Sequence, residues 1–180
     1  ACPHCGAPLE FRPTASAFSV FPFCRSTLLR DGDALRRIGA SAELFDDRTP
    51  LQLGAAGRWQ GSAFTLVGRL QLRYAGGAWN EWHALFDTGR SGWLSEDNGR
   101  CVMAFEAALD VPPPDLATLR PGAALRLAGD DWQVGAVVAA TLGAAEGELP
   151  FAPALGAAST IVELRNARDE VGSLERDGDG

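Results

Sequence analysis

Hydrophobic and polar residues alternate most clearly over residues 64–74, which predicts a half-buried antiparallel strand. Under a strict period of two, one face carries Phe64, Leu66, Leu70, Leu72 and Tyr74, and the other carries Thr65, Arg69, Gln71 and Arg73. A glycine turn at 75–77 leads into a predicted partner strand over 79–86. Further strands are predicted to end near Leu94 and to cover 101–105, 125–127, 132–140 and 160–164.

Many short strands with glycine-rich turns indicate a mainly β fold, a small antiparallel β-barrel or sandwich. The pattern also repeats at a constant offset of 68 residues: Gly54, Gly61, Phe64 and Leu66 recur as Gly122, Gly129, Trp132 and Val134. Two interpretations stay open. The domain is built from two duplicated, SH3-like halves, or its β-hairpins merely share turn chemistry.

The chain divides into four predicted parts. Residues 1–30 form a zinc-ribbon-like segment, 31–50 a linker, 51–165 the β-rich domain and 166–180 a polar tail that we expect to be frayed. The linker predicts a short helix over 31–44, interrupted by Gly39. Asp31 or Asp33 would cap it, and its apolar stripe would be Leu35, Ile38 and Ala42.

Composition narrows the class of protein. The 180 residues are 46% hydrophobic and carry a net charge of −7, which fits a globular domain and disfavours general binding to nucleic-acid phosphates. The longest weakly polar run, 134–145, is shorter than the roughly 18 residues that a transmembrane helix needs. No secretory signal opens the chain, so we expect a cytoplasmic protein.

Three of the four cysteines point to a metal site. Cys2 and Cys5 are spaced as one knuckle of a zinc ribbon, and Gly6 follows them. A second knuckle is expected 15 to 20 residues on, and there Cys24 is present while Phe21 occupies the other ligand position.

Three interpretations of this site compete. Zinc binds to Cys2, Cys5 and Cys24 with a fourth ligand from His4, water or a partner, although His4 lies inside the knuckle and is a poor candidate. Alternatively the metal is lost and Phe21 fills the gap, or an open three-cysteine site is catalytic. Cys101 lies in a strand-like run and reads as a small hydrophobic residue.

Three of the five tryptophans lie within fifteen residues, which suggests a recognition surface. The candidate binding residues are Trp79, Glu81, Trp82 and Trp93. The alternative is that Trp82 and Trp93 fill the core of a hairpin. No nucleophile elbow, P-loop or zinc-protease motif occurs, so the only catalytic candidates are Glu81, His83 and Asp87, and we assign no catalytic residue.

These motifs together resemble the bacterial family of domain of unknown function 4178, preceded by a zinc-ribbon-like segment. The matching stretches are 2–6, 22–27, 64–69, 79–82, 87–94 and 146–150. The family pattern has cysteine where this chain has Phe21. The resemblance implies a setting near envelope-stress and polyamine-related genes, hence a membrane-associated assembly, and a chain that continues beyond these residues.

The leading hypothesis is a non-enzymatic adaptor that binds a protein partner through the β-domain. A second is a nucleic-acid-associated zinc-ribbon protein, for which Arg12, Arg25, Arg30, Arg36 and Arg37 would supply a basic front segment. The third is an enzyme that uses Glu81, His83 and Asp87.

Overall fold

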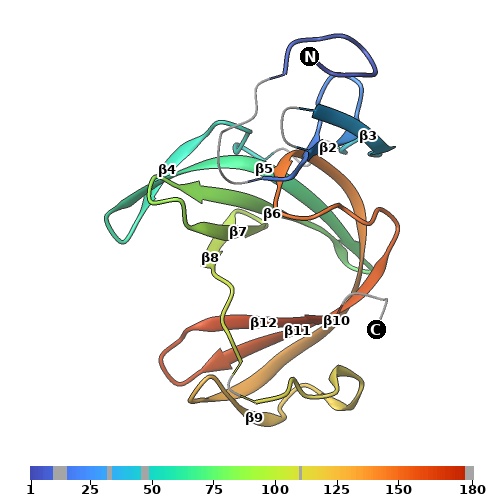
Figure 1. Cartoon of the computed structure of the whole chain (residues 1–180). Helices are drawn as coiled ribbons and strands as arrows, with labels where there is room; N and C mark the ends of the chain where they lie inside the picture. Colours follow the sequence, from blue (N-terminus) through green and yellow to red (C-terminus); the bar gives the residue numbers. More distant parts are fainter. Residues whose placement is uncertain (10–15, 32–33, 46–48, 110, 177–180) are drawn as a thin grey trace.

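The structure is a computed structural model that describes residues 1–9, 16–31, 34–45, 49–109 and 111–176. Within these residues the chain is mainly β-structure with one short 3₁₀ helix, η1 (Leu116–Thr118), which confirms the mainly β prediction (Figure 1). The strands are β1 (Phe18–Val20), β2 (Ser26–Asp31), β3 (Ala34–Ala40), β4 (Ala56–Trp59), β5 (Ser62–Tyr74), β6 (Gly77–Phe86), β7 (Ser91–Asp97), β8 (Arg100–Ala104), β9 (Ala124–Leu127), β10 (Asp130–Leu149), β11 (Ala158–Asn166) and β12 (Val171–Arg176).

All strand pairs are antiparallel and belong to one branched sheet. The main path runs β3-β2-β1-β10-β5-β6-β7-β8, while β4 pairs with β5, β9 and β11 pair with β10, and β12 pairs with β11. The path has two open ends in the described part of the chain, so the sheet is not closed into a barrel. The 20-residue strand β10 curves in Figure 1 from the layer that contains β9, β11 and β12 to the layer that contains β5 and β6, and it belongs to both.

The internal repeat of the sequence is a duplication of the structure. The first repeat is β4–β7 and the second is β9–β12. Gly54 N–H donates to Leu66 O at 2.8 Å, and at an offset of 68 Gly122 N–H donates to Val134 O at 2.8 Å. The following hairpins share a turn whose first residue has a left-handed φ, 47° at Gln60 and 50° at Ala128.

The pairing registers agree beyond these turns. The β5–β6 pair has a bulge between Leu66 and Gly68, and the β10–β11 pair has its bulge at the equivalent place, between Val134 and Ala136. In the last two strands the offset is 80, because the β10–β11 connection is longer than the β5–β6 turn. Shared turn chemistry alone does not reproduce two bulges and three strand registers, so the duplication interpretation holds.

The bulge corrects the predicted faces of β5. Phe64 and Leu66 lie opposite Phe86 and Ala84, as the strict alternation requires, but after the bulge Arg69 lies opposite Trp82. The inserted Val67 reverses the alternation, because a bulge adds one residue to one strand. Arg69 therefore shares a face with Phe64 and Leu66 and is buried, whereas Leu70 and Leu72 point to the other side of the sheet.

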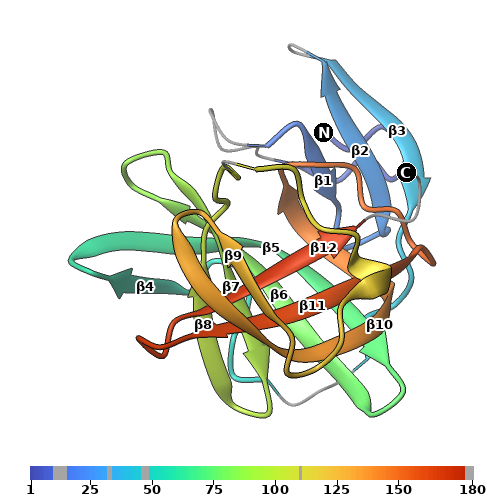
Figure 2. The same cartoon turned by 90° about the horizontal axis from the view of Figure 1, so that it is seen from below.

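Two faces result, and they bury different clusters. The outer face of the first repeat packs Phe64, Leu66, Trp82, Ala84 and Phe86, and that of the second packs Val134, Val162 and Leu164 beneath η1. The inner faces turn toward one another: Trp79 and Trp93 of the first repeat and Ile161 of the second all pack on one cluster around Leu70, Leu72 and Ala140. Viewed from below, the second repeat lies across the first (Figure 2).

Two predictions about the ends of the domain are wrong. Residues 34–40 form strand β3 rather than part of a helix, because backbone pairing with β2 outweighs the local spacing of Leu35 and Ile38. The proposed cap Asp33 lies outside the described residues, and Asp31 lies in β2. Residues 171–176 of the tail expected to fray instead form β12, which pairs with β11 from Val171 to Arg176, while 177–180 lie outside the described residues.

Candidate functional site

The cysteines sit on two turns that share one geometry. Gly6 N–H donates to Cys2 O at 2.9 Å in the first turn, and Arg25 N–H donates to Phe21 O at 2.7 Å in the second. The fifth residues of the two turns, Gly6 and Arg25, both have a left-handed φ, of 73° and 53°. The second turn is therefore an intact knuckle in its backbone, and Phe21 stands where the first knuckle has Cys2.

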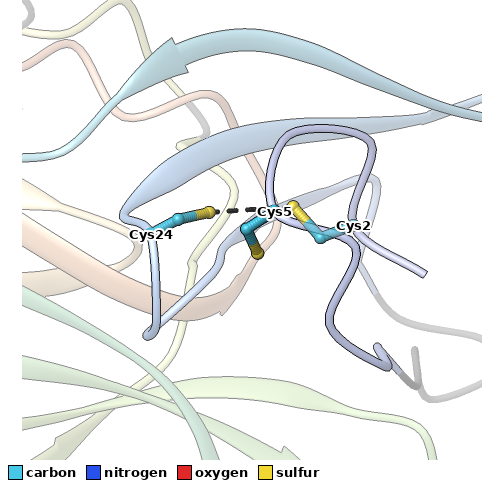
Figure 3. A group of neighbouring side chains, drawn as sticks. All are labelled: Cys2, Cys5 and Cys24. Atoms are coloured by element: carbon cyan, nitrogen blue, oxygen red, sulfur yellow. Dashed lines mark hydrogen bonds between the residues drawn. The ribbon is translucent and has the colours of Figure 1, made fainter.

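These two turns bring three sulfurs together. The Sγ atoms of Cys2, Cys5 and Cys24 all lie within 4.8 Å of one another, and those of Cys2 and Cys24 are 3.7 Å apart (Figure 3). Three thiolates around one ion at about 2.3 Å would lie within roughly 4 Å of one another, so the group can hold a metal ion with small adjustment. The predicted set of cysteines is the one that the structure assembles; Cys101 is exposed on β8 and is not part of it.

The surroundings of the sulfurs differ from one side to the other. Cys2 and Phe21 are buried with Leu28 in one small apolar cluster, whereas Cys5 and His4 are exposed. Cys24 Sγ lies 3.3 Å from Ser26 Oγ, and hydrogen bonding from Ser26 lowers the pKa of the Cys24 thiol to about 7. Metals bind the thiolate form, so this contact favours metal binding near neutral pH.

The tryptophan-rich hairpin divides between the two faces. Trp82 is fully buried on the outer face and donates from Nε1 to Glu96 Oε2 at 3.0 Å, so it presents no surface to a partner. Trp79 and Trp93 lie half-buried on the inner face with Glu81 between them along the strands. Trp93 also stacks on the exposed ring of Phe151, with ring centroids 5.8 Å apart.

Glu81 is a carboxylate in a largely apolar place. Its Oε1 accepts hydrogen bonds from Trp79 Nε1 and Ser95 Oγ, both at 2.9 Å. Burial nevertheless raises the pKa of Glu81 to about 7, against the opposing effect of these two bonds, and the nearby charge of Glu175 on β12 adds to the increase. The carboxyl group is thus poised between its neutral and charged forms at neutral pH.

The three residues of the catalytic hypothesis, Glu81, His83 and Asp87, have separate surroundings. His83 Nδ1 lies 2.9 Å from Glu148 O, a carbonyl that only accepts, so Nδ1 carries the proton and Nε2 is the acceptor for Ser91 Oγ at 2.5 Å. Burial lowers the pKa of His83, which keeps the ring neutral. Glu81 has the separate partners described above, and Asp87 is exposed in the β6–β7 turn. Glu81, His83 and Asp87 therefore do not converge on one point.

A buried polar network on the outer face was missed by the sequence analysis. Arg69 donates from Nε and Nη2 to Asn80 Oδ1, at 3.0 and 2.8 Å, and its guanidinium lies 4.7 Å from the centroid of the Trp82 ring. Asn80 donates in turn to Glu96 Oε2 at 3.2 Å, and Thr49 Oγ1 donates to Glu96 Oε1 at 2.6 Å. The network connects β5, β6 and β7 to the segment before β4. No local sequence signal could reveal it, because the bulge in β5 changes which residues lie on the outer face.

The basic front segment is dispersed. Arg25 forms an ion pair with Glu43 at 3.2 Å, and Arg36 and Arg37 are exposed neighbours on β3, which point to opposite sides of the strand. Arg12 lies outside the described residues.

The fold and the site define a class: a duplicated antiparallel β-meander that carries two cysteine knuckles at its N-terminal end. A family model described as "Domain of unknown function (DUF4178)" matches residues 52–180, and the chain belongs to this family. The match begins after the knuckles, so it covers both repeats but not Cys2, Cys5 or Cys24. No curated protein and no solved structure matches the chain. Among the described residues, no helix is long and apolar enough to cross a membrane.

Proposed function

We propose that this protein is a non-catalytic binding module, and that the partly exposed residues Trp79, Glu81 and Trp93 on the inner face of its first repeat bind a basic side chain of a protein partner. The observation that carries the proposal is the position of the Glu81 carboxylate between two half-buried tryptophans, Trp79 and Trp93.

The chemistry of this face suits a cation. An ammonium or guanidinium group is attracted both by a carboxylate and by the face of an indole ring, and each attraction grows as water is excluded. Glu81 and Glu175 place two acidic groups on the facing strands, and a charge of −7 over the chain favours approach of a basic partner. The role previously considered for Trp82 is therefore structural: it holds Glu96 on the opposite face.

The cysteine knuckles enter this proposal as a support for the domain. A metal ion on Cys2, Cys5 and Cys24 would clip the N-terminal turn to the start of β2, since Cys24 precedes Ser26. Zinc is the ion that such knuckles usually hold.

Titration with short peptides tests the proposal. The probes are acetylated and amidated Gly-Arg-Gly and Gly-Lys-Gly, with Gly-Gln-Gly as the neutral control, followed by tryptophan fluorescence at fixed ionic strength. We expect a saturable change with the basic peptides that weakens at least about tenfold in Glu81→Gln, because a charge-assisted contact is lost. Trp79→Leu should weaken it as well.

A matched control separates this site from the general acidity of the chain. Glu106→Gln removes one carboxylate from an exposed position before the second repeat and should leave binding unchanged. The proposal fails if Gly-Gln-Gly binds as well as the basic peptides, or if Glu81→Gln and Glu106→Gln bind alike.

A further inference from the structure

The two knuckles are related by a shift of 19 residues, which identifies the role of each ligand position. Cys2 corresponds to Phe21 and Cys5 to Cys24, and in both turns the first residue also donates its backbone N–H to the residue five positions on, Ala7 or Ser26, at 2.9 and 3.0 Å. A four-cysteine ribbon would therefore place its fourth thiolate at residue 21. The structure has a benzene ring at this position instead.

Phe21 does more than leave a ligand out. Its side chain is 3% exposed and packs in the cluster that contains Cys2 and Leu28, with the sulfur of Cys24 at the edge of that cluster. Phe23 covers it further, with ring centroids 5.4 Å apart. A water molecule that took the fourth position would lie against apolar carbon with no hydrogen-bond partner there, which is unfavourable.

Metal ions differ in how they tolerate three ligands. Structural zinc is almost always tetrahedral with four protein ligands. Soft thiolates also select copper(I), a singly charged ion that three sulfurs can satisfy. The negative charge of a three-thiolate complex would be solvated at Cys5, which is exposed, and would have a hydrogen-bond partner in the buried Ser26, whose Oγ lies 3.3 Å from Cys24 Sγ.

We propose that Cys2, Cys5 and Cys24 form a three-coordinate thiolate site that selects copper(I) over zinc, because Phe21 closes the fourth position. Binding converts three thiols into thiolates and releases their protons to solvent, while the ion enters and stays as copper(I). No electron is transferred, so no oxidant or reductant takes part. This inference does not depend on the proposed binding of a basic side chain.

Competition between chelators tests the selectivity. The full chain, with Cys101→Ser as a common background and under anaerobic reducing conditions, is titrated separately with copper(I) and zinc against chromophoric chelators of known affinity. We expect one copper(I) per chain, and X-ray absorption should show three sulfur neighbours. Cys5→Ser should lose this binding.

Restoring the fourth ligand provides the decisive variant. Phe21→Cys should bind zinc at least about tenfold more tightly than the parent chain, because it completes the tetrahedral set. Phe23→Cys is the matched control: it adds a thiol two residues away at an 80% exposed position, so it should not change zinc affinity.

Several outcomes would overturn the inference. They are zinc binding by the parent chain as tight as that of Phe21→Cys, a fourth light-atom neighbour around copper, or copper(I) binding that survives Cys5→Ser. Should Phe21→Cys fail to fold, as circular dichroism would reveal, the coordination number measured in the parent chain still decides between three and four ligands.

Discussion

The two repeats share one backbone arrangement but bury different side chains, and some positions that are polar in the first repeat are apolar in the second. Each is a four-stranded meander with the same turn, the same bulge and the same registers. The outer face of the first repeat buries Arg69 and Asn80, and the equivalent positions of the second carry Val137 and Thr160. On the inner face, Glu81 of the first repeat corresponds to Ile161 of the second.

This difference separates what the fold needs from what the site needs. Turns and bulges are backbone features, and the second repeat shows that they form around an apolar core. Even an arginine that braces the turn recurs: Arg58 donates to Gly61 O at 3.3 Å and Arg126 to Gly129 O at 3.0 Å. The buried and half-buried polar groups of the first repeat are therefore not required by the meander itself, and one of them, Glu81, is the group at which we propose binding.

The largest difference in stability between the two repeats should appear when the centre of the outer-face network is removed. Arg69→Leu should lower the free energy of unfolding by about 3–5 kcal/mol, because it removes both hydrogen bonds to the buried Asn80 Oδ1 and the ion pair with Glu146, which lies 3.7 Å from Arg69. Val137→Leu, at the equivalent position, should change it by less than about 1.5 kcal/mol. Urea denaturation measures both, and similar losses would mean that the two interiors are equivalent after all.

Gly68 and Ala136 form a matched pair at the two bulges. A Cβ added at Gly68 would lie 2.1 Å from Glu148 O, the backbone of β10, so Gly68→Ala should cost about 3 kcal/mol. Among the described strands, only β11 pairs with β10 at Ala136, so the equivalent position of the second repeat has room for the alanine that it already carries. Ala136→Gly should cost only about 0.5–1 kcal/mol, through chain entropy. Thermal unfolding of both variants would contradict this account if Gly68→Ala were the milder one.

A pH series isolates Glu81. Its folded pKa of about 7 lies above the ordinary value of 4.5, so the folded state holds a proton that the unfolded state releases between these values. This group therefore stabilises the fold fully below about pH 4.5, and the stabilisation is lost as pH rises through 7. Glu81→Gln removes that dependence, and relative to wild type its unfolding free energy should rise by about 2–3 kcal/mol from pH 4.5 to 8.

The control for this series is again the exposed-position variant Glu106→Gln, measured over the same pH range. A constant difference between Glu81→Gln and wild type would show that the carboxyl group of Glu81 has the same pKa in the folded and unfolded states.

The smallest effect should be equal in the two repeats. Gln60 and Ala128 adopt a left-handed φ immediately before a glycine, a conformation that suits asparagine better. Gln60→Asn and Ala128→Asn should each stabilise the protein by about 0.5 kcal/mol, measured by chemical denaturation. Opposite signs would indicate that the two turns are not equivalent in energy.

Much of the architecture could be read from local patterns. The glycines at 54 and 61, repeated at 122 and 129, predicted the duplicated turns, and the spacing of Cys2, Cys5 and Cys24 predicted the sulfur cluster. What failed was whatever depended on distant pairing. In place of the helix over 31–44, residues 34–40 pair with β2, and 171–176 of the tail pair with β11 as β12. Arg69 lies on the other face from the one predicted, because of one inserted residue in β5.

The sequence by itself determined where the chain turns and which residue types are available, because turns and knuckles are set by residues close together along the chain. Only the tertiary structure decided that Trp82 is buried, that Glu81 faces the second repeat and that Phe21 is buried in one cluster with Cys2. The physical reason is that burial and charge environment come from contacts between strands far apart in sequence, and a single bulge reverses which side chains make them.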